Sequence, residues 1–492
     1  MVESNTLTQP YPTAITETSQ IGDELNWTEV KLREVIDRGG RLEAGVFGVK
    51  GRHARELLHN CGWPIKPLCG DDGLSNAYNF TRFKRIFVER SSYPIFQPSQ
   101  ITEINPTPSS FISSKTPTDI ESLRVHKNQI LLTCSGTIGN CTVVSETLDN
   151  QIFSHDLIRI NTKNYEDMGF IYAFLRSKTG RAIVNTNNYG AVISHIEPSH
   201  LMDVPVPIPS LEIKQNIQNK IVQSFKLRDE SNALINKAQK LLKTEIGLPN
   251  IDDIRPDYSD NDANIRSFNI RLSNLDDRFD SSYHVPLIGE IEKYLKEGAA
   301  EVTTLGDPKI SKNIISPGRF KRVYVREGQG VIFFGGKQLF DLDPTNKKYL
   351  SLKHHAKRIK DELTLRQNMV LITCSGTIGK VSLTPKHWDG WTANQHIIRI
   401  VPTSDDIAGY LFVWLSSEYA HPLITRFTYG AVIYEIDYEH AKQIQVPLLK
   451  NSETQKTIND LALNANLKRS NAYLLEQEAI RIMDDTVIRC DD

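Results

Sequence analysis

Long apolar runs are missing from this sequence of 492 residues. No stretch approaches the roughly 18 to 20 apolar residues that a membrane-spanning helix needs, and no basic segment followed by an apolar core stands near the N-terminus. The sequence has six cysteines and no CxxC pair. This pattern is typical of reduced thiols in a cytoplasm, so we expect a cytoplasmic protein with no disulfides and no membrane partner.

An excess of one charge sign is also missing, because 58 basic and 59 acidic residues give a formal net charge of -1. The total does not favour nucleic-acid binding, since a dedicated DNA-binding domain often has a pI above about 9. The charges are nevertheless clustered. Basic residues gather at Lys84 and Arg85, at 319–326 and at 353–360, while acidic residues gather at 252–262. Each basic cluster is compatible with a DNA-binding patch or with an ordinary solvated surface.

Three catalytic motifs are absent from the sequence. There is no Asn-Pro-Pro-Tyr or Asp-Pro-Pro-Tyr of an amino-methyltransferase, no His-Glu-x-x-His, and no GxxxxGK[ST] phosphate loop. Residues 376–380 come nearest to the phosphate loop, but Cys374 replaces its first glycine and Val381 replaces its Ser or Thr. We therefore expect neither a nucleotide-binding loop nor a catalytic centre.

The cysteines also lack the neighbours that metal binding or catalysis requires. His59, Cys61 and Cys69 suggest zinc, but no fourth ligand is near in sequence. Cys134 and Cys374 have no histidine neighbour in sequence, so we expect them to be small buried residues rather than nucleophiles. No metal site is predicted.

What the sequence does contain is an internal duplication. Three blocks recur at an offset of 240 positions. The pairs are residues 131–139 and 371–379, 158–160 and 398–400, and 189–193 and 429–433. In the first pair eight of nine residues are identical, and both members contain the sequence Ser-Gly-Thr-Ile-Gly. Such agreement in register indicates two copies of one structural unit.

Two further blocks lie upstream at an offset of 237 positions. The Arg-Phe-Lys-Arg sequence at 82–85 recurs at 319–322, and residues 41–43 correspond to 278–280. Between the blocks the two copies have diverged strongly. A basic pair that recurs where its surroundings have changed is a candidate for contact with a ligand.

Each copy predicts a β-rich core followed by a long helix. Apolar β-branched runs flank the Ser-Gly-Thr-Ile-Gly turn, which predicts two strands, and a proline-rich extended segment precedes the helix. Residues 210–247 and 451–483 carry apolar side chains at spacings near three and four, which is typical of amphipathic helices. A helix of about 35 residues is roughly 50 Å long, and two can pack antiparallel as a coiled coil.

In this ordered set of motifs the sequence resembles the specificity (S) subunits of type I restriction-modification systems. Those proteins repeat a β-rich recognition domain with a Gly-x-Ile-Gly-type turn, which leads into a helix beginning Leu-Glu-x-x-Gln. Residues 211–215 fit that junction, and residues 453–458 fit its second copy, with Gln215 and Gln455 again 240 positions apart.

The resemblance covers residues 40–247 and 275–485 and implies a domain organisation. The expected segments are an N-terminal extension (1–39), target-recognition domain 1 (40–209), long spacer helix 1 (210–247), an acidic linker (248–274), target-recognition domain 2 (275–449), and long spacer helix 2 with a tail (450–492). The expected fold class is α+β. Two repeated β-rich domains are each followed by a long helix, and the helices pack as an antiparallel coiled coil about a pseudo-two-fold axis.

The resemblance also implies a function: a non-catalytic, sequence-specific DNA-binding subunit of a defence system against phage and other foreign DNA. It would direct partner subunits to a bipartite target, asymmetric because the two units have diverged. The expected partners are double-stranded DNA, two DNA methyltransferase subunits and restriction subunits. No cofactor is expected on this chain, since S-adenosylmethionine would bind the partner methyltransferase. The helices would hold the two units apart, at a spacing of about 15 base pairs.

We expect DNA contacts at the duplicated basic and short polar residues, because phosphates are bound by Lys, Arg and hydroxyl groups. The candidates are Arg82, Lys84, Arg85, Thr133, Ser135, Thr137 and Tyr189 in the first copy, and Arg319, Lys321, Arg322, Thr373, Ser375, Thr377 and Tyr429 in the second. Alternatively, the hydroxyl residues only form the turn and the tyrosines only close a loop.

A different class of function is a DNA-recognition protein with cryptic nuclease activity, located in the N-terminal extension or in residues 300–365. A nuclease needs carboxylates that bind a metal ion. Asp341 and Asp343, followed by Lys347 and Lys348, are the candidates, but they have no obvious match in the first copy. A polar loop explains them equally well.

Overall fold

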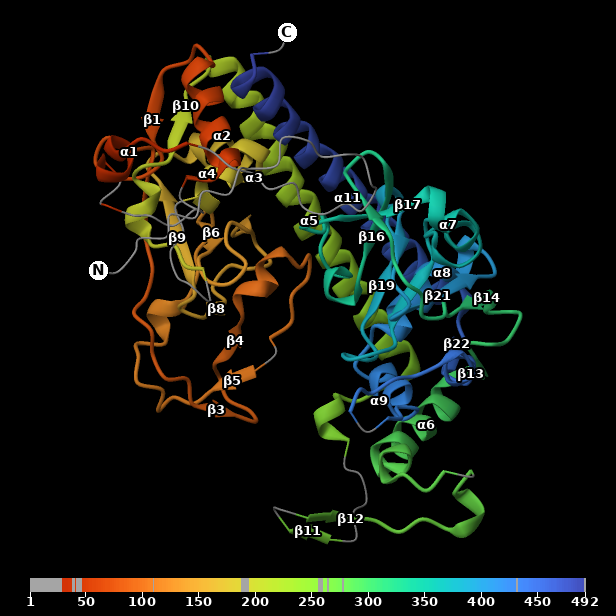
Figure 1. The fold of residues 1–492 in the computed structure, drawn as a ribbon. Coiled ribbons are helices and arrows are strands. Elements are labelled where there is room, and N and C mark those ends of the chain that lie inside the picture. The colour runs from red at the N-terminus through yellow and green to blue at the C-terminus, as the bar shows by residue number, and fades with distance from the viewer. Residues whose placement is uncertain are drawn as a thin grey trace, which may run out of the picture.

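The computed structural model describes residues 29–37, 40, 47–108, 110–186, 194–254, 260–262, 265–276, 278–430 and 432–490. Most of the predicted N-terminal extension, the block 41–43 and Tyr189 lie outside these described residues. Two lobes lie on a pair of long helices (Figure 1). Within the described ranges, no helix is long and apolar enough to cross a membrane.

The first lobe, called here the first unit, is built on three small sheets. Its elements are α1 (Leu32–Asp37), α2 (Val49–Asn60), β1 (Ile65–Pro67), β2 (Ser75–Tyr78), β3 (Phe87–Val88), β4 (Pro94–Phe96), β5 (Ser110–Ile112), β6 (Ile130–Thr133), β7 (Cys141–Val143), β8 (Ile152–Phe153), β9 (Leu157–Thr162), α3 (Met168–Arg176), α4 (Lys178–Thr186) and β10 (Pro205–Pro207). The sheet orders are β2-β9-β6-β7, β3-β5-β4-β8 and β1-β10.

The second unit repeats this plan. Its elements are α6 (Pro286–Gly298), β13 (Ala299–Thr304), β14 (Ser311–Ile315), β15 (Tyr324–Val325), β16 (Gly330–Phe334), β17 (Lys348–Ser351), α7 (Leu352–Arg358), β18 (Val370–Thr373), β19 (Val381–Leu383), β20 (Thr392–Ala393), β21 (Ile397–Pro402), α8 (Asp405–Leu415), α9 (Ala420–Thr425), α10 (Tyr438–Lys442) and β22 (Gln445–Leu449). A short hairpin, β11 (Asp260–Asp262) and β12 (Ile265–Ser267), precedes it.

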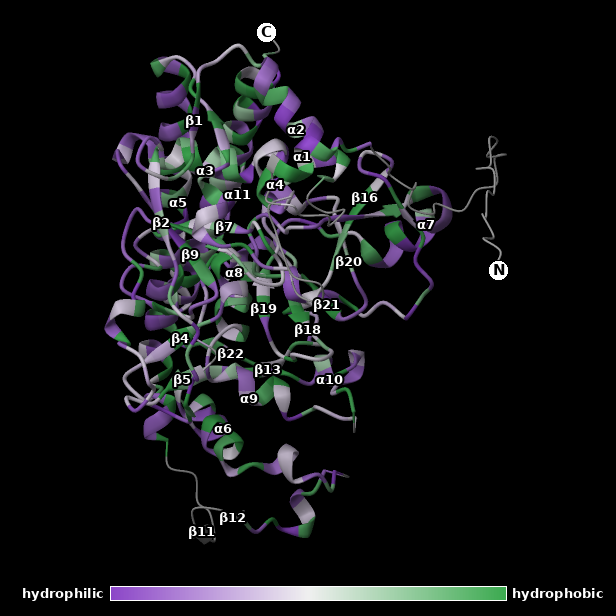
Figure 2. Cartoon of the chain, turned by 60° about the vertical axis from the view of Figure 1, so that its left-hand side comes forward, coloured by the Kyte–Doolittle hydropathy of each residue, from purple (hydrophilic) through white to green (hydrophobic). Residues whose placement is uncertain are grey.

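The sheets of the second unit have the orders β14-β21-β18-β19, β15-β17-β16-β20 and β13-β22, which match the first unit strand for strand. The register agrees as well, since Ile130 pairs with Ile160 and Val370 pairs with Ile400. In Figure 2, β18, β19 and β21 are green and hydrophobic, whereas the outer helix α7 is largely purple. The predicted α+β class with two repeated β-rich domains is confirmed.

The two long helices run antiparallel. Helix α5 (Leu211–Ile246) has 36 residues and ends at Gly247, whose φ of 75° is left-handed, as a glycine C-cap allows. Helix α11 (Ser452–Ile482) has 31 residues and continues as a π-helix over Met483–Ile488. Lys220 of α5 pairs with Glu478 of α11 at 2.9 Å. Near the middle, Glu230 of α5 pairs with Lys468 of α11 at 2.6 Å. Residue numbers in α11 therefore decrease as those in α5 increase, which confirms the predicted antiparallel packing.

The helices correspond at an offset of 241 positions rather than 240. The side-chain carbonyl of Gln218 accepts the backbone N–H of Gly169, and that of Asn459 accepts the backbone N–H of Gly409 at 2.8 Å. The predicted equivalence of Gln215 and Gln455 is therefore wrong. The second copy has one additional residue between strand and helix, because Val206 lies four positions before the N-cap Ser210, whereas its equivalent Val446 lies five positions before the N-cap Asn451.

Both helices contribute to the core of each unit. The core of the first unit contains Ile217 and Ile221 from α5 together with Ala479 from α11. The core of the second unit contains Ile235 from the other end of α5 and Ile458 from the other end of α11. Because burial of apolar surface is the main stabilising term in folding, each unit depends on both helices.

The units also contact each other directly. The Ile104 N–H donates to the Phe340 carbonyl at 2.9 Å, and the Thr102 hydroxyl donates to Asp341 at 2.8 Å. Arg176 pairs with Asp343 at 2.8 Å. Loops of the two units therefore meet beside the helix pair, so helix length by itself does not set the separation of the units.

Candidate nucleic-acid interface

In the second unit the Ser-Gly-Thr-Ile-Gly turn lies against the Tyr-Gly-Ala-Val-Ile loop. The Gly376 N–H donates to the Tyr434 carbonyl at 3.1 Å, and the Ile436 N–H donates to the Cys374 carbonyl at 3.0 Å. The loop is closed at its base by two backbone hydrogen bonds between Tyr429 and Glu435, of 3.0 and 2.9 Å. Two duplicated blocks that are far apart in the sequence are thus neighbours in the fold.

The basic segment of the second unit lies beside the same turn and loop. Arg319 pairs with the Glu435 carboxylate at 3.0 Å, and the Ser375 hydroxyl donates to that carboxylate at 3.2 Å. Arg322 donates to the Gln395 side-chain carbonyl at 2.7 Å. Lys321 is exposed. The structure therefore brings the predicted residues of the basic segment, the turn and the loop into one surface cluster.

The tip of this loop is apolar and exposed. Val432 is 94% exposed, Ile433 58% and Tyr434 57%, beside Tyr429, which is also exposed. Apolar side chains rarely gather at an exposed tip without a binding partner. The tip adds residues to the candidate interface that sequence analysis missed, although the exact repeat of the loop sequence was the signal for it.

The first unit shows the same arrangement where it is described. The Gly136 N–H donates to the Ser194 carbonyl at 3.1 Å, matching the turn contact of the second unit. Phe83 packs edge-on against His155 with ring centroids 5.1 Å apart, and Arg85 donates to the Gln97 side chain at 3.0 Å. Arg82 and Lys84 are exposed, as is Thr137, while Tyr189 lies outside the described residues.

The charge of the basic segments acts on one histidine in each unit. Burial lowers the pKa of His155, and the charges of Arg85 and Arg82 lower that pKa further. Burial also lowers the pKa of His396, and Arg322 and Arg319 act in the same direction. In both units, therefore, the arginines of the basic segment lie close enough to this histidine to lower its pKa.

Some predicted contacts are buried in the turn itself. The Thr133 hydroxyl donates to the Thr137 carbonyl at 2.5 Å and accepts the Asn140 N–H at 3.0 Å. Thr373 accepts the Lys380 N–H at 3.0 Å in the same way. Both hydroxyls are used inside the protein, which matches the turn-forming alternative, so we leave them out of the surface proposed below. Thr377 is exposed at the tip of its turn.

The neighbouring cysteines are buried thiols. Burial raises the pKa of Cys134 to about 11 and that of Cys374 to about 12. A thiol with so high a pKa is a poor nucleophile at neutral pH. Over the described part of the chain, no group of three or more His, Cys, Asp or Glu side chains could hold a metal ion.

Sequence analysis missed two buried arginines, although the repeated Ile-Arg-Ile blocks contain them. Arg159 and Arg399 are fully buried in the central strands β9 and β21. Arg399 donates to the carbonyls of Ile397 at 2.6 Å and of Ala393, and Arg159 donates to the Leu123 carbonyl at 3.1 Å. Burial lowers the pKa of each to about 10. Through these hydrogen bonds the arginines link the sheet that carries the turn to the adjoining segments.

The candidate nuclease residues have structural partners. Asp343 binds Arg176 at 2.8 Å and Lys347 at 2.5 Å, and it accepts a hydrogen bond from Gln477 at 3.1 Å. Asp341 accepts the Thr102 hydroxyl. Both carboxylates belong to the contact between the units, so no observation favours a nuclease centre there.

Comparison with known proteins gives a family match. The family model "Type I restriction modification DNA specificity domain" matches residues 79–244 and 328–461, that is, much of each unit with part of its helix. No curated protein matches this chain.

Three solved structures are similar to the chain at low identity. The S subunit of a type I restriction-modification system from M. genitalium is 16% identical over 87% of this chain and 96% of that chain, with a TM-score of 0.33. The HsdS subunit from Thermoanaerobacter tengcongensis is 15% identical over 88% and 97%, with a TM-score of 0.26. A chain from a study of complex assembly and conformational transition of the type I R-M system is 15% identical over 88% and 98%, with a TM-score of 0.27.

Proposed function

Because this chain belongs to the family of type I restriction modification DNA specificity domains, we propose that it recognises a bipartite DNA sequence through its two units and has no catalytic activity of its own. In this proposal it directs DNA methyltransferase subunits, two per chain, and restriction subunits to that sequence in the cytoplasm. S-adenosylmethionine binds the methyltransferase partner. The target is asymmetric, because the two units differ in most of their residues outside the repeated blocks.

One observation supports the proposal most directly: in the second unit the duplicated basic segment and the duplicated glycine turn meet on one surface at Glu435, and the contact of the turn recurs in the first unit. Lys and Arg side chains and exposed amides bind phosphates and fix the register of a protein on DNA. Apolar side chains contact thymine methyl groups or enter the minor groove. The exposed tip at Val432 and Ile433, next to Arg319, has both chemistries in one place.

The salt dependence of DNA binding tests the basic segments. Replacing Lys84 and Arg85, or Lys321 and Arg322, with Ala should weaken binding, and each lost phosphate contact should reduce the log-log salt slope by about 0.9. A matched control removes Lys293 and Lys296, two exposed lysines of α6 in the second unit. An unchanged slope for both test pairs, in protein that melts like the wild type, excludes these residues from the interface.

Two further measurements test the rest of the proposal. Selection from random duplex DNA should yield two unlike half-sites at a constant spacing. The purified chain alone should show no methyl transfer and no cleavage, whereas metal-dependent cutting by a homogeneous preparation would contradict the non-catalytic role.

A further inference from the structure

A buried polar cluster closes one side of the contact between the units. Glu476 of α11 is 1% exposed and accepts the Tyr172 hydroxyl at 2.5 Å. It pairs with Arg176 at 3.3 Å and with Arg228. Arg176 also pairs with Asp343 of the second unit. Every charge in this cluster therefore has an opposite charge beside it.

The duplication places an equivalent position on the other side of the helix pair. The units correspond at 240 positions and the helices at 241. The loops that follow β4 and β16 correspond at an offset of 238 positions. In the first, the Gln100 side chain donates to the Thr107 carbonyl, and in the second, the Gln338 side chain donates to the Thr345 carbonyl, both at 2.6 Å. The equivalents of the cluster can therefore be named residue by residue.

On this second side, Arg469 is the only charged residue left at the positions equivalent to the cluster. The replacements are Phe412 for Tyr172, Ser416 for Arg176, Arg469 for Arg228, Ile235 for Glu476 and Asn105 for Asp343. Both carboxylates are lost, while the arginine of the helix pair is kept. Shorter side chains now stand where Tyr172 and Arg176 fill the first side.

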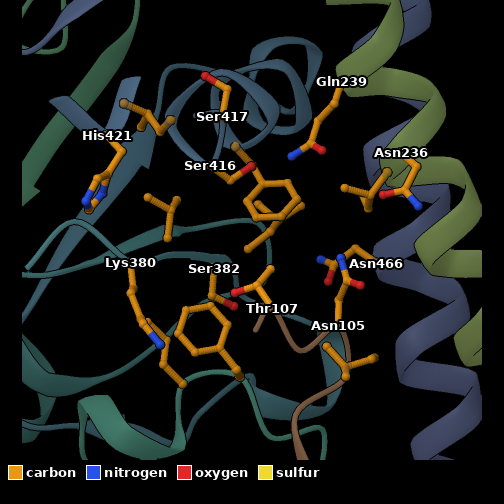
Figure 3. Close-up of a pocket in the computed structure, with 18 of the residues that line it drawn as sticks. Asn105, Thr107, Asn236, Gln239, Lys380, Ser382, Ser416, Ser417, His421 and Asn466 are labelled. Atoms are coloured by element: carbon orange, nitrogen blue, oxygen red, sulfur yellow. The ribbon is translucent and has the colours of Figure 1, made fainter. Parts of the chain in front are cut away.

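The result is an open cavity of about 860 Å³, here called the interunit cavity. Figure 3 shows Asn236, Gln239 and Asn466 of the two helices on one side and Lys380, Ser382 and His421 of the second unit across from them. Asn105 and Thr107 come from the first unit. Its volume lies within the range of pockets that bind small molecules, about 300 to 1,000 Å³.

Arg469 is the unusual group in the wall of this cavity. It is 9% exposed, and burial lowers its pKa to about 10. Its Nε donates to the Ser231 hydroxyl at 3.4 Å and its Nη2 to the Asn232 side chain at 3.3 Å. Among the described residues no carboxylate pairs with it and no acceptor meets its Nη1. A buried charge without a counter-charge is costly, which favours binding of an anion.

The remaining lining residues suit the rest of such a ligand. Lys240, Lys243 and Lys380 add further cations, and the Lys380 ammonium lies over the Phe340 ring at 5.1 Å. Phe412 and Trp388 supply further aromatic surface. Three carboxyls line the cavity: burial raises the pKa of Asp341 to about 7 and also raises that of Glu103, while Glu418 pairs with Lys243 at 4.0 Å. None of them pairs with Arg469, so the counter-charge of this arginine is left to a ligand.

We propose that the interunit cavity binds a small aromatic anion of nucleotide size, whose phosphate or carboxylate pairs with Arg469 and whose ring lies against Phe340 and Phe412. The anionic group of the ligand supplies the counter-charge that Glu476 provides on the closed side. Since the cavity is lined by both units and both helices, occupation stabilises the contact between the units. The site does not depend on DNA recognition.

The test uses the full chain with AMP and benzoate as anionic probes, and adenosine and inorganic phosphate as half-ligands. AMP or benzoate should raise the melting temperature and bind in calorimetry, while adenosine and phosphate should bind more weakly. R469M should weaken the binding of the anionic probe about tenfold or more, because a charge-assisted hydrogen bond is lost. Its matched control is R228M, the equivalent arginine of the closed side, which should leave the probe's affinity unchanged in folded protein.

A second variant keeps the proposal testable if R469M is poorly folded. I235E restores the carboxylate that Glu476 provides on the closed side, so it should neutralise Arg469 and abolish binding, whereas I235L should not. Absence of binding by both anionic probes, or wild-type affinity in R469M or I235E, overturns the proposal. DNA affinity is measured in parallel, so a failure of the DNA-binding function is recognised separately.

Discussion

At the scale of single residues, the buried arginines of the central strands are the clearest structural determinants. Arg399 donates to three carbonyls from the end of β20 to the start of β21, those of Ala393, Asn394 and Ile397. We expect R399M to lower the free energy of unfolding by about 2 to 4 kcal/mol, because those acceptors would lose the arginine as their donor. Urea denaturation measures this, with R366M as control, since the Arg366 side chain is 63% exposed. Equal effects of the two variants would contradict the role.

Asp341 makes stability depend on pH. Burial raises its pKa to about 7 in the folded protein, whereas an unfolded aspartate has a pKa of about 3.9. The folded state then holds this proton more tightly, so the contribution of Asp341 to stability is largest below pH 4 and is lost as the pH rises towards 7. Neighbouring Glu103 favours the protonated form, and Arg176 opposes it.

The variant D341N should remove this dependence. Between pH 4.5 and 8 we expect the wild type to lose on the order of 3 kcal/mol relative to D341N. Denaturation midpoints at several pH values measure the difference. Parallel curves for the two proteins would show that Asp341 does not titrate in this range.

At the scale of elements, the helix pair depends on a buried polar layer as well as on apolar packing. Glu476 of α11 is the shared partner of Arg176 and Arg228. We expect E476Q to cost about 3 to 5 kcal/mol of stability, because the buried Arg228 loses its counter-charge and Arg176 keeps only Asp343. The control is E478Q on the same helix, whose partly exposed pair with Lys220 should contribute less than about 1 kcal/mol. Similar losses in both variants would argue against a special role for Glu476.

Contacts of α5 with the first unit affect the outcome of an insertion in this helix. Asn232, at the middle of α5, donates to the Ile104 carbonyl at 2.7 Å and to the Thr147 hydroxyl at 3.0 Å. Four additional residues there would break these bonds to the first unit as well as lengthen the helix by about 6 Å. The separation of the two units therefore depends on loop contacts and helix length together.

At the scale of the whole molecule, the shared cores predict that neither half folds alone. A fragment of residues 29–254 lacks Ala479, Met483 and Val487, which complete the core of the first unit. We expect it to lack a cooperative thermal transition by circular dichroism, and to regain one when mixed with a fragment of residues 255–492. A cooperative transition in the isolated fragment, at the temperature of the intact chain, would contradict this dependence.

The sequence by itself determined the two-unit plan, the strand-turn-strand core of each unit and the two long helices. Repeated blocks in register define equivalent elements, and apolar spacing defines a helix, because both signals are local along the chain. The basic segments and the Tyr-Gly-Ala-Val-Ile loop were also visible as repeats, although the exposure of Val432 and Ile433 was not.

Only the tertiary structure decided which of those residues face outward and which face each other. Thr373 and Thr377 have the same residue type and stand four positions apart, yet the first is buried at the end of β18 and the second is exposed in the turn that follows. The pairing of Asp343 with Arg176 and the interunit cavity bring together residues that are far apart in the sequence. The offset of 241 between the helices likewise became visible only from their contacts. Such contacts depend on how elements pack in space, which spacing along one chain does not encode.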